Sequence, residues 1–420
     1  MGDGTNYYQQ YQPRRSFDSD LYIMIPCEME DGFASASKIQ EAKRDQVADK
    51  WLFEVNDYLH TFISVDIADH IQSHFIGRKP LACLGINYDR QVEGQEDAYL
   101  FLLQHDQSDL YLLVIAVFLP GSSVTRLMEQ SASNDLFLVE SGAAASPKVN
   151  VIQYIRDTYH LAKVGESKHL LTISNMPDDR NEFLSMLACE TYKDFLYDPQ
   201  MRDYYRLSSD DVAREADENF SQYDYYELYA SRRSVVFVPE KYSKDDRLSN
   251  IEDDATILFI LIPILFKSTA ILRTNAKITS ALAVHGDATI ETIDSLYTEF
   301  GKTVIFWEDD IYRDITTSNI ASHINEAFRT KQVMESYLFK QNFLTQIVKL
   351  HDVESSNREG KILNTVVIIL TVIQVMPVLT DFWAWLGSSG YTPGTLELAG
   401  GGMVALLVVI LIAYRHAKRK

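Results

Sequence analysis

Cysteine is scarce in this sequence, and its start carries no apolar run. The three cysteines among 420 residues (Cys27, Cys83 and Cys189) stand far apart and form no Cys-x-x-Cys pair. This spacing excludes a zinc ribbon or a disulfide framework and favours buried thiols in a reducing compartment. The first twenty residues are polar and do not resemble a signal peptide, so we predict a flexible tail over residues 1–20.

Positive charge is scarce as well. Lys and Arg number 39 against 59 Asp and Glu, which gives a net charge of −20, and all of the excess acid lies before Arg358. Because an acidic surface repels phosphates, we expect no nucleic-acid partner. The surface would concentrate cations, although a solvated acidic face that only aids solubility is the plainer interpretation.

Common catalytic motifs are missing. The sequence contains no P-loop, no Gly-rich dinucleotide fingerprint and no hydrolase triad spacing. We therefore expect no catalytic residues, no resident cofactor and no enzyme. Hydrophobic residues make up 46% of the chain, which is enough for a packed core, and the mean hydropathy of −0.14 is too low for a polytopic membrane protein.

Two uncharged apolar runs near the C-terminus predict membrane spans. The run Ile362–Thr380, with Trp383 and Trp385 at its far interface, predicts a transmembrane helix over residues 362–386. The run Leu398–Tyr414 predicts a second helix over residues 398–414. Lys and Arg flank these runs only before the first span and in the basic tail 415–420. The loop 387–397 is therefore expected outside, and both termini in the cytosol beneath the plasma (inner) membrane.

The chain before the spans predicts a mixed domain over residues 21–312, with a possible subdivision near residues 141–147. The apolar stretch Ala255–Phe266 is too short for a span and fits a buried strand or a core helix. Helical periodicity appears in Asn181–Tyr197 and Thr289–Phe300. Short β-branched and aromatic runs predict strands at Leu21–Ile25, Leu81–Tyr88, Tyr99–Gln104, Leu110–Phe118, Leu170–Ile173, Val235–Val238 and Val304–Trp307.

A long stalk helix is predicted over residues 313–361. From Asp314 to Asn357 there is no Pro or Gly, and apolar residues recur at spacings of three, four and seven. A helix of about 40 residues is roughly 60 Å long, so its apolar stripe needs a partner on the domain or on other subunits. The fold class is therefore an α+β cytosolic domain followed by a long stalk helix and two C-terminal transmembrane helices.

This arrangement resembles the CorA family of divalent-cation channels. The segment KILNTVVIILTVIQVMPVLTDF at Lys361–Phe382 is similar to the first CorA span, including the pair Met376-Pro377. The resemblance implies a homo-oligomer, in this family a pentamer, whose first span lines a pore for Mg²⁺ or another divalent cation. The family's Gly-Met-Asn signature is replaced here by WLGSSG at Trp385–Gly390, so the implied magnesium selectivity does not carry over.

Three functions follow as hypotheses. The first is a CorA-like channel or transporter for cations with a cytosolic regulatory domain, in which a divalent cation is the transported or the regulatory ion. The second is a membrane effector of prokaryotic defence, gated by a small nucleotide messenger, as some divergent two-span relatives are thought to be. The third is a non-conducting membrane anchor or scaffold.

Polar residues of the first span are the candidate pore lining. Asn364, Thr371 and Gln374 would offer rings of oxygen and amide dipoles to a cation, and Asp381 would form a carboxylate ring at the outer mouth. The alternatives are hydrogen bonds between helices for the first three residues and a solvated loop acid for Asp381.

Several polar clusters of the soluble part are candidates for ligand binding, each with a plainer structural interpretation. Asp66, His70 and His74 would share one helix face and could hold zinc. Acidic clusters could bind magnesium or calcium, basic residues could cradle an anion, and the tyrosines between Tyr204 and Tyr229 could stack on a base. The acidic clusters are Asp210–Asp211, Glu252–Asp254 and Glu308–Asp310, and the basic residues are Arg14, Arg15, Arg126, Arg232 and Arg233, with the turn Gly121–Ser123.

Overall fold

The structure is a computed structural model of the full chain. It describes residues 17–30, 39–83, 98–120, 124–139, 148–190, 214, 216–284, 311–340 and 342. The chain divides into two units, Met1–Gln341 and Asn342–Lys420, and the description below concerns the first. The two predicted spans, the loop and the tail lie outside the described residues, together with the candidate pore residues Asn364, Thr371, Gln374 and Asp381.

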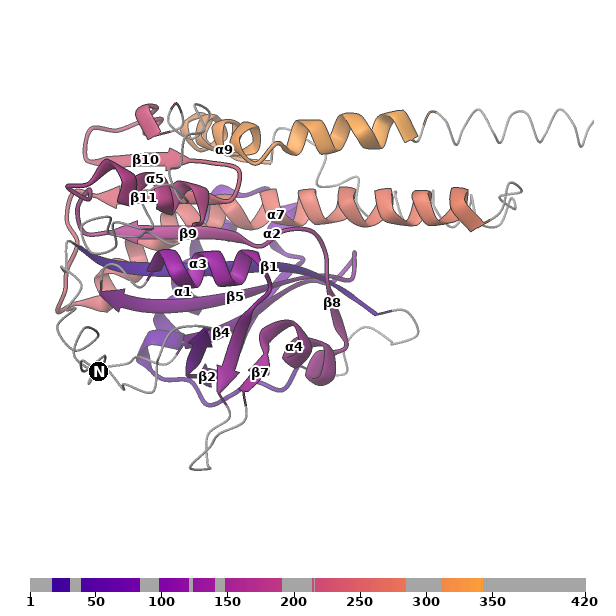
Figure 1. The fold of residues 1–420 in the computed structure, drawn as a ribbon, viewed down its shortest axis with the longest axis horizontal. Coiled ribbons are helices and arrows are strands. Elements are labelled where there is room, and N and C mark those ends of the chain that lie inside the picture. Colours follow the sequence, from indigo (N-terminus) through magenta and orange to yellow (C-terminus); the bar gives the residue numbers. More distant parts are fainter. Residues whose placement is uncertain are drawn as a thin grey trace, which may run out of the picture. The chain divides into compact units, whose positions relative to one another are not determined.

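A large sheet with an almost wholly antiparallel ladder forms the centre of this unit (Figure 1). Its strand order is β10-β11-β9-β1-β5-β4-β2, with β8 paired to one end of β1, and only β9 and β11 run parallel. A second sheet has the order β3-β6-β7. The strands of the large sheet are β1 (Asp18–Met29), β2 (Ile71–Lys79), β4 (Ala98–His105), β5 (Leu110–Pro120), β8 (Leu161–Lys163), β9 (Lys168–Ile173), β10 (Tyr226–Ala230) and β11 (Ser234–Pro239); those of the small sheet are β3 (Leu81–Cys83), β6 (Leu136–Val139) and β7 (Lys148–Asn150).

Both faces of the large sheet are buried, because its central strands are apolar at nearly every position. In β1, Tyr22 and Met24 face one core, and Leu21 and Ile23 face the other. Side chains alternate between the two faces of a strand, so a continuous apolar run requires cover on both sides. The fold is therefore three-layered, with helices on each face of the sheet.

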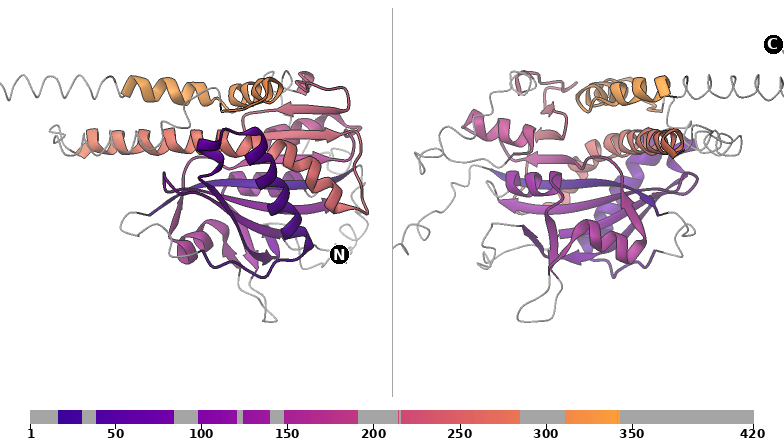
Figure 2. Two further views of the ribbon diagram at one scale, coloured as in Figure 1. Left: turned by 180° about the vertical axis from the view of Figure 1, so that it is seen from behind. Right: turned by 45° about the vertical axis from the view of Figure 1, so that its right-hand side comes forward.

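Two groups of helices supply that cover (Figure 2). The first core is covered by α1 (Gln46–Phe62), α7 (Arg247–Val284) and α9 (Ile315–Ala327). The second is covered by α3 (Val124–Ala132), α4 (Val151–Tyr159) and α5 (Arg180–Ala188). The short helix α2 (Val65–Ala68) follows α1.

Helix α7 contains the apolar stretch Ala255–Phe266, for which the sequence left a buried strand and a core helix open, and the structure shows the core helix. The helix is much longer than the twelve residues predicted, since it has 38 residues and continues through Pro263. Among the described residues it is the one helix long and apolar enough to cross a membrane, and 78% of its most apolar window is buried inside the fold. It packs against α1 and the sheet. Its hydropathy therefore reflects a central place in the core.

Five predicted strands are confirmed, including the pair that forms the β4–β5 hairpin. The strand predicted at Leu81–Tyr88 is confirmed for β3, and its remainder lies outside the described residues with Val304–Trp307, Thr289–Phe300 and residues 141–147. The helix predicted over Asn181–Tyr197 ends early, because Cys189 adopts a left-handed conformation (φ 55°) that caps α5. Strands before and after residues 141–147 pair within one sheet.

The predicted stalk helix begins where expected but is not continuous. The side chain of Asp314 caps α9 by accepting a hydrogen bond from the backbone N–H of Thr317 at 3.1 Å. The helix ends at Ala327, Arg329 has a left-handed φ of 58°, and residues 330–340 are helical again. The prediction of one unbroken helix is therefore wrong at residues 328–329, where buried Phe328 holds the chain in the core. No Gly or Pro marked this break in the sequence.

The apolar stripe of the stalk has a partner within its own chain over α9. Ile320, Ala321 and Ile324 are buried in the core shared with α1 and α7. Of the two partners expected for the stripe, the domain or other subunits, the domain is the one that these residues contact. Beyond the break, Leu338 and Phe339 are exposed.

The variant Arg329→Gly should raise the free energy of unfolding by about 0.5–1 kcal/mol, because glycine adopts a positive φ without the strain that a side chain imposes. In an unbroken helix the same change would lower it by about 1 kcal/mol. The sign therefore reports the break. Thermal unfolding of the full-length chain in detergent measures it, with Lys331→Gly inside the second helical segment as a control that should destabilise.

Candidate functional site

In the part of the chain that the structure describes, the histidine and acidic candidates do not gather into a metal site. Asp66 lies on α2 whereas His74 lies on β2, so the predicted common helix face does not exist. Each histidine ring meets a single carboxylate instead: His70 Nδ1 lies 2.9 Å from Asp106 and His74 Nδ1 lies 3.0 Å from Glu41. Among the residues that the structure describes, no three His, Cys, Asp or Glu side chains gather to hold a metal ion.

The acidic cluster Glu252–Asp254 is dispersed by the turn of α7. Glu252 points to solvent beside Lys50 at 3.2 Å, Asp253 lines a pocket, and Asp254 is fully buried under the sheet. Three consecutive residues of a helix point about 100° apart, so they cannot share one cation. The clusters Asp210–Asp211 and Glu308–Asp310 lie outside the described residues.

A pocket of about 780 Å³ lies in this unit. Its walls come from α1, the approach to β10, the end of β11, the first half of α7 and the first turns of α9. The volume falls within the range of small-molecule sites. Eight aromatic side chains line it: Tyr58, Phe62, Tyr223, Tyr225, Tyr226, Phe237, Tyr242 and Phe259.

These rings form two contact groups. In one group Tyr58 stacks on Phe259 with ring centroids 5.6 Å apart, and Phe62 lies 5.4 Å from Phe259. In the other, Tyr225 lies 5.2 Å from both Tyr223 and Tyr226. Tyr223 and Tyr225 are 45% and 55% exposed, which is unusual for neighbouring aromatic rings unless they meet a partner.

The local backbone explains why two tyrosines are presented to solvent. The side chain of Asn219 accepts hydrogen bonds from the N–H groups of Ser221 and Leu228, which closes the segment between them into a tight loop. Phe220 is buried beneath this loop and stacks on His323 of α9 at 5.5 Å. The loop thus packs against α9, and its tyrosines line the pocket.

The pocket is acidic as well as aromatic. Four carboxylates line it, from Glu240, Asp246, Asp253 and Asp314, against one cation, Lys241. Burial, followed by the charge of Glu252, raises the pKa of Asp253 above its usual value. Carboxylates accept hydrogen bonds and attract positive charge, and tyrosine faces attract cations and stack on flat rings. The lining therefore suits a planar ring that carries amino groups or a positive charge, and it disfavours phosphate.

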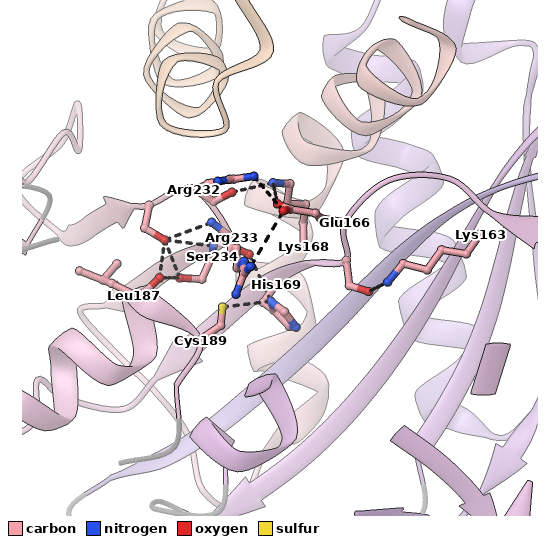
Figure 3. Close-up of polar contacts among 11 residues, drawn as sticks. Lys163, Glu166, Lys168, His169, Leu187, Cys189, Arg232, Arg233 and Ser234 are labelled. Atoms are coloured by element: carbon pink, nitrogen blue, oxygen red, sulfur yellow. Dashed lines mark hydrogen bonds and ion pairs between the residues drawn. The ribbon is translucent and has the colours of Figure 1, made fainter. Parts of the chain in front are cut away.

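A second polar group gathers at the tip of the β10–β11 hairpin, and we call Glu166, Lys168, Arg232 and Arg233 the hairpin-tip cluster (Figure 3). The parallel pairing of β11 with β9 places Ser234 opposite His169, so the Arg232-Arg233 turn lies beside Lys168. Arg232 pairs with Glu166 at 2.8 Å.

A cysteine and a histidine meet beneath this cluster but lack the properties of a nucleophile. Cys189 Sγ lies 3.3 Å from His169 Nδ1, and the other ring nitrogen lies 2.5 Å from the hydroxyl of Ser131. Burial raises the pKa of Cys189 to about 12 and lowers the pKa of His169 to about 3. A reactive thiolate–imidazolium pair needs the opposite shifts, so this pair is a neutral part of the core.

The sequence alone indicated part of the aromatic pocket and part of the hairpin-tip cluster. The tyrosine stretch and the Arg232-Arg233 pair were candidates, whereas Tyr58, Phe259 and Lys168 carried no signal because only the fold brings them to these residues. Arg14, Arg15, the turn Gly121–Ser123 and the side chain of Arg126 lie outside the described residues. No family model, curated protein or solved structure matches this chain.

Proposed function

We propose that this chain is a CorA-like, homo-oligomeric membrane channel for cations whose N-terminal unit binds a small planar ligand in the aromatic pocket. The observation that supports this most is the origin of the pocket's walls. Asp314, Thr316, Thr317 and Ile320, from the start of α9, line it. The same stretch of chain continues through residues 330–340 toward the predicted spans.

The physical link is a difference in affinity between two arrangements of α9. A ligand shifts an equilibrium only if it binds one arrangement better than the other. A ring held between the tyrosines and α9 contacts the cap residue Asp314 and the first helical turn directly. Any movement of that turn changes the ligand's contacts, and by reciprocity ligand binding biases the position of the turn.

The chemistry of the pocket favours a ligand-gated channel over a constitutive transporter. An amino-bearing aromatic base meets both requirements of the lining, which are stacking faces and hydrogen-bond acceptors. A nucleotide messenger of prokaryotic defence has such a base, which would enter the pocket while its phosphates stay outside the acidic lining. We infer that the transported ion is a cation from the residues of the first predicted span. Oxygen and amide dipoles favour cations, and they come from Asn364, Thr371 and Gln374, with the carboxylate of Asp381 at the mouth.

The test measures cation flux from liposomes that hold the full-length chain, with adenosine and adenylate dinucleotides as flat-ring probes. We expect a probe to change the flux, and Tyr225→Ala to weaken its apparent affinity at least fivefold, since stacking on one ring is worth about 1–3 kcal/mol. Tyr225 is half exposed, so its loss should spare the fold. Phe53→Ala is the matched control, because Phe53 is an exposed aromatic ring outside the pocket.

Thr371→Leu separates the pore from the pocket. It should block flux by placing an apolar ring in the first span, while probe binding stays unchanged. Flux that ignores every probe, or that responds equally in Tyr225→Ala, would contradict gating through the pocket. No flux at all from the wild type would support a scaffold instead.

A further inference from the structure

The hairpin-tip cluster holds more positive charge than its own carboxylate compensates. Arg232, Arg233 and Lys168 approach Glu166 at 2.8, 3.9 and 3.7 Å, so three cations share one acid (Figure 3). The rest of the chain is strongly acidic, which makes this concentration of cations unusual. Clusters of Arg and Lys of this kind are what proteins use to bind phosphate groups.

One of the cations is buried. Lys168 is only 8% exposed, and burial, opposed by the charge of Glu166, lowers its pKa to about 8. Among the described residues, this ammonium group pairs with one carboxylate, Glu166, and shares it with two guanidinium groups. A buried charge that is incompletely neutralised is costly. A bound dianion would supply the missing negative charge. The side chains of Arg232 and Arg233 are 54% and 40% exposed, so their N–H groups remain accessible to such a ligand.

The same lysine touches the break in the stalk. Its Nζ donates to the backbone carbonyl of Arg232 at 2.6 Å and lies 4.8 Å from the ring centroid of Phe328. Phe328 is the residue at which α9 ends, directly before left-handed Arg329. An ammonium group over an aromatic ring is attracted to it, and the attraction weakens when the ammonium pairs with an anion. An anion bound at the hairpin tip would therefore weaken the attraction between Lys168 and Phe328, the residue at the break between α9 and segment 330–340.

We propose that Lys168, Arg232 and Arg233 bind a phosphate group of a soluble small molecule, and that this binding alters the order of the helical segment 330–340. The site is separate from the aromatic pocket, whose four carboxylates disfavour phosphate. A lipid headgroup carries the same chemistry and is the other source of phosphate. The inference does not depend on channel activity.

Binding is tested by calorimetry on the full-length chain in uncharged detergent, with inorganic pyrophosphate as the probe at 0.15 M salt. We expect saturable binding that falls at least tenfold in the double variant Arg232→Gln/Arg233→Gln. Glu166→Gln should strengthen binding severalfold, because it removes the carboxylate that competes with the ligand. Arg156→Gln is the matched control, since that exposed arginine pairs with a single acid, Glu30, at 2.7 Å.

The link to the stalk is tested by hydrogen exchange. Pyrophosphate should change the exchange of residues 330–340, and Phe328→Leu should remove this change while pyrophosphate affinity stays within about twofold. No saturable binding, or equal binding by the double arginine variant, would overturn the site. Binding that appears only in bilayers with anionic lipid would overturn the soluble ligand and assign the cluster to a headgroup. None of these measurements involves ion flux or the aromatic pocket, so their failure is distinct from failure of the proposed function.

Discussion

The variant Asp254→Asn should unfold at a higher temperature than the wild type at pH 8, and this difference should shrink as the pH falls toward 5. Asp254 is fully buried, accepts a hydrogen bond from the Tyr22 hydroxyl at 2.6 Å and another from Thr172. Burial, and then the charge of Asp20, raise the pKa of Asp254 well above its usual value. The folded protein therefore holds this proton where the unfolded chain releases it.

The sign follows from proton linkage. Between the unfolded and the folded pKa of Asp254 the folded state binds more protons, so the free energy of unfolding falls by up to about 1.4 kcal/mol for each unit that the pH rises. Asparagine is a neutral mimic of the protonated acid and removes this slope. Thermal unfolding of the full-length chain between pH 5 and 8 measures it. Glu252→Gln, on the exposed side of the same helix, is the control, and an Asp254→Asn effect independent of pH would refute the argument.

Gly165→Ala should lower the free energy of unfolding by about 2–3 kcal/mol. Gly165 has a φ of 76°, and a Cβ atom there would lie 2.7 Å from Cδ1 of Leu272 on α7. A side chain in the left-handed region costs about 1–2 kcal/mol, and moving the leucine off its rotamer costs about 1 kcal/mol more. Because Gly165 directly precedes Glu166, the same change should disturb the hairpin-tip cluster.

A double-mutant cycle separates the two costs. In a Leu272→Ala background the contact is gone, so Gly165→Ala should cost about 1 kcal/mol less than in the wild type, and the backbone cost should remain. Urea unfolding of the full-length chain gives each value. If Gly165→Ala lowers the free energy of unfolding equally in both backgrounds, the backbone near Gly165 relaxes away from Leu272 without an energetic penalty.

Short β-branched and aromatic runs predicted the central strands well, because β1, β4 and β5 are apolar on both faces. The same property made α7 hard to assign, because a continuous apolar run is equally compatible with a buried strand and a buried helix. The full length of α7, 38 residues, distinguishes the two. The break at Phe328 had no local signal, since its cause is the packing of one ring into the core and not a Gly or Pro.

The sites were harder to predict than the fold, because each is assembled from distant segments. Tyr58 and Tyr225 are 167 positions apart and line one pocket only because the fold brings α1 and the segment before β10 to it. Lys168 reaches Arg232 through the parallel pairing of β9 with β11, which a single sequence does not encode in any short motif. The sequence showed the pair Arg232-Arg233, but it gave no sign that buried Lys168 lies beside it.

The position of β1 at the middle of the sheet has a consequence for synthesis. Its neighbours are β5 and β9, which are synthesised later. Asp18 can pair only after Pro120 has been made, and Leu21 can pair with β9 only after Leu171 has been made. At about 5–20 residues per second, the strand stays unpaired for several seconds on the ribosome and needs protection from aggregation. The first core is completed only when Ile320, Ala321, Ile324 and Phe328 have been synthesised, and the last of these stands roughly 35 residues before the first predicted span. Completion of the N-terminal unit and synthesis of the predicted spans therefore fall within the same few seconds.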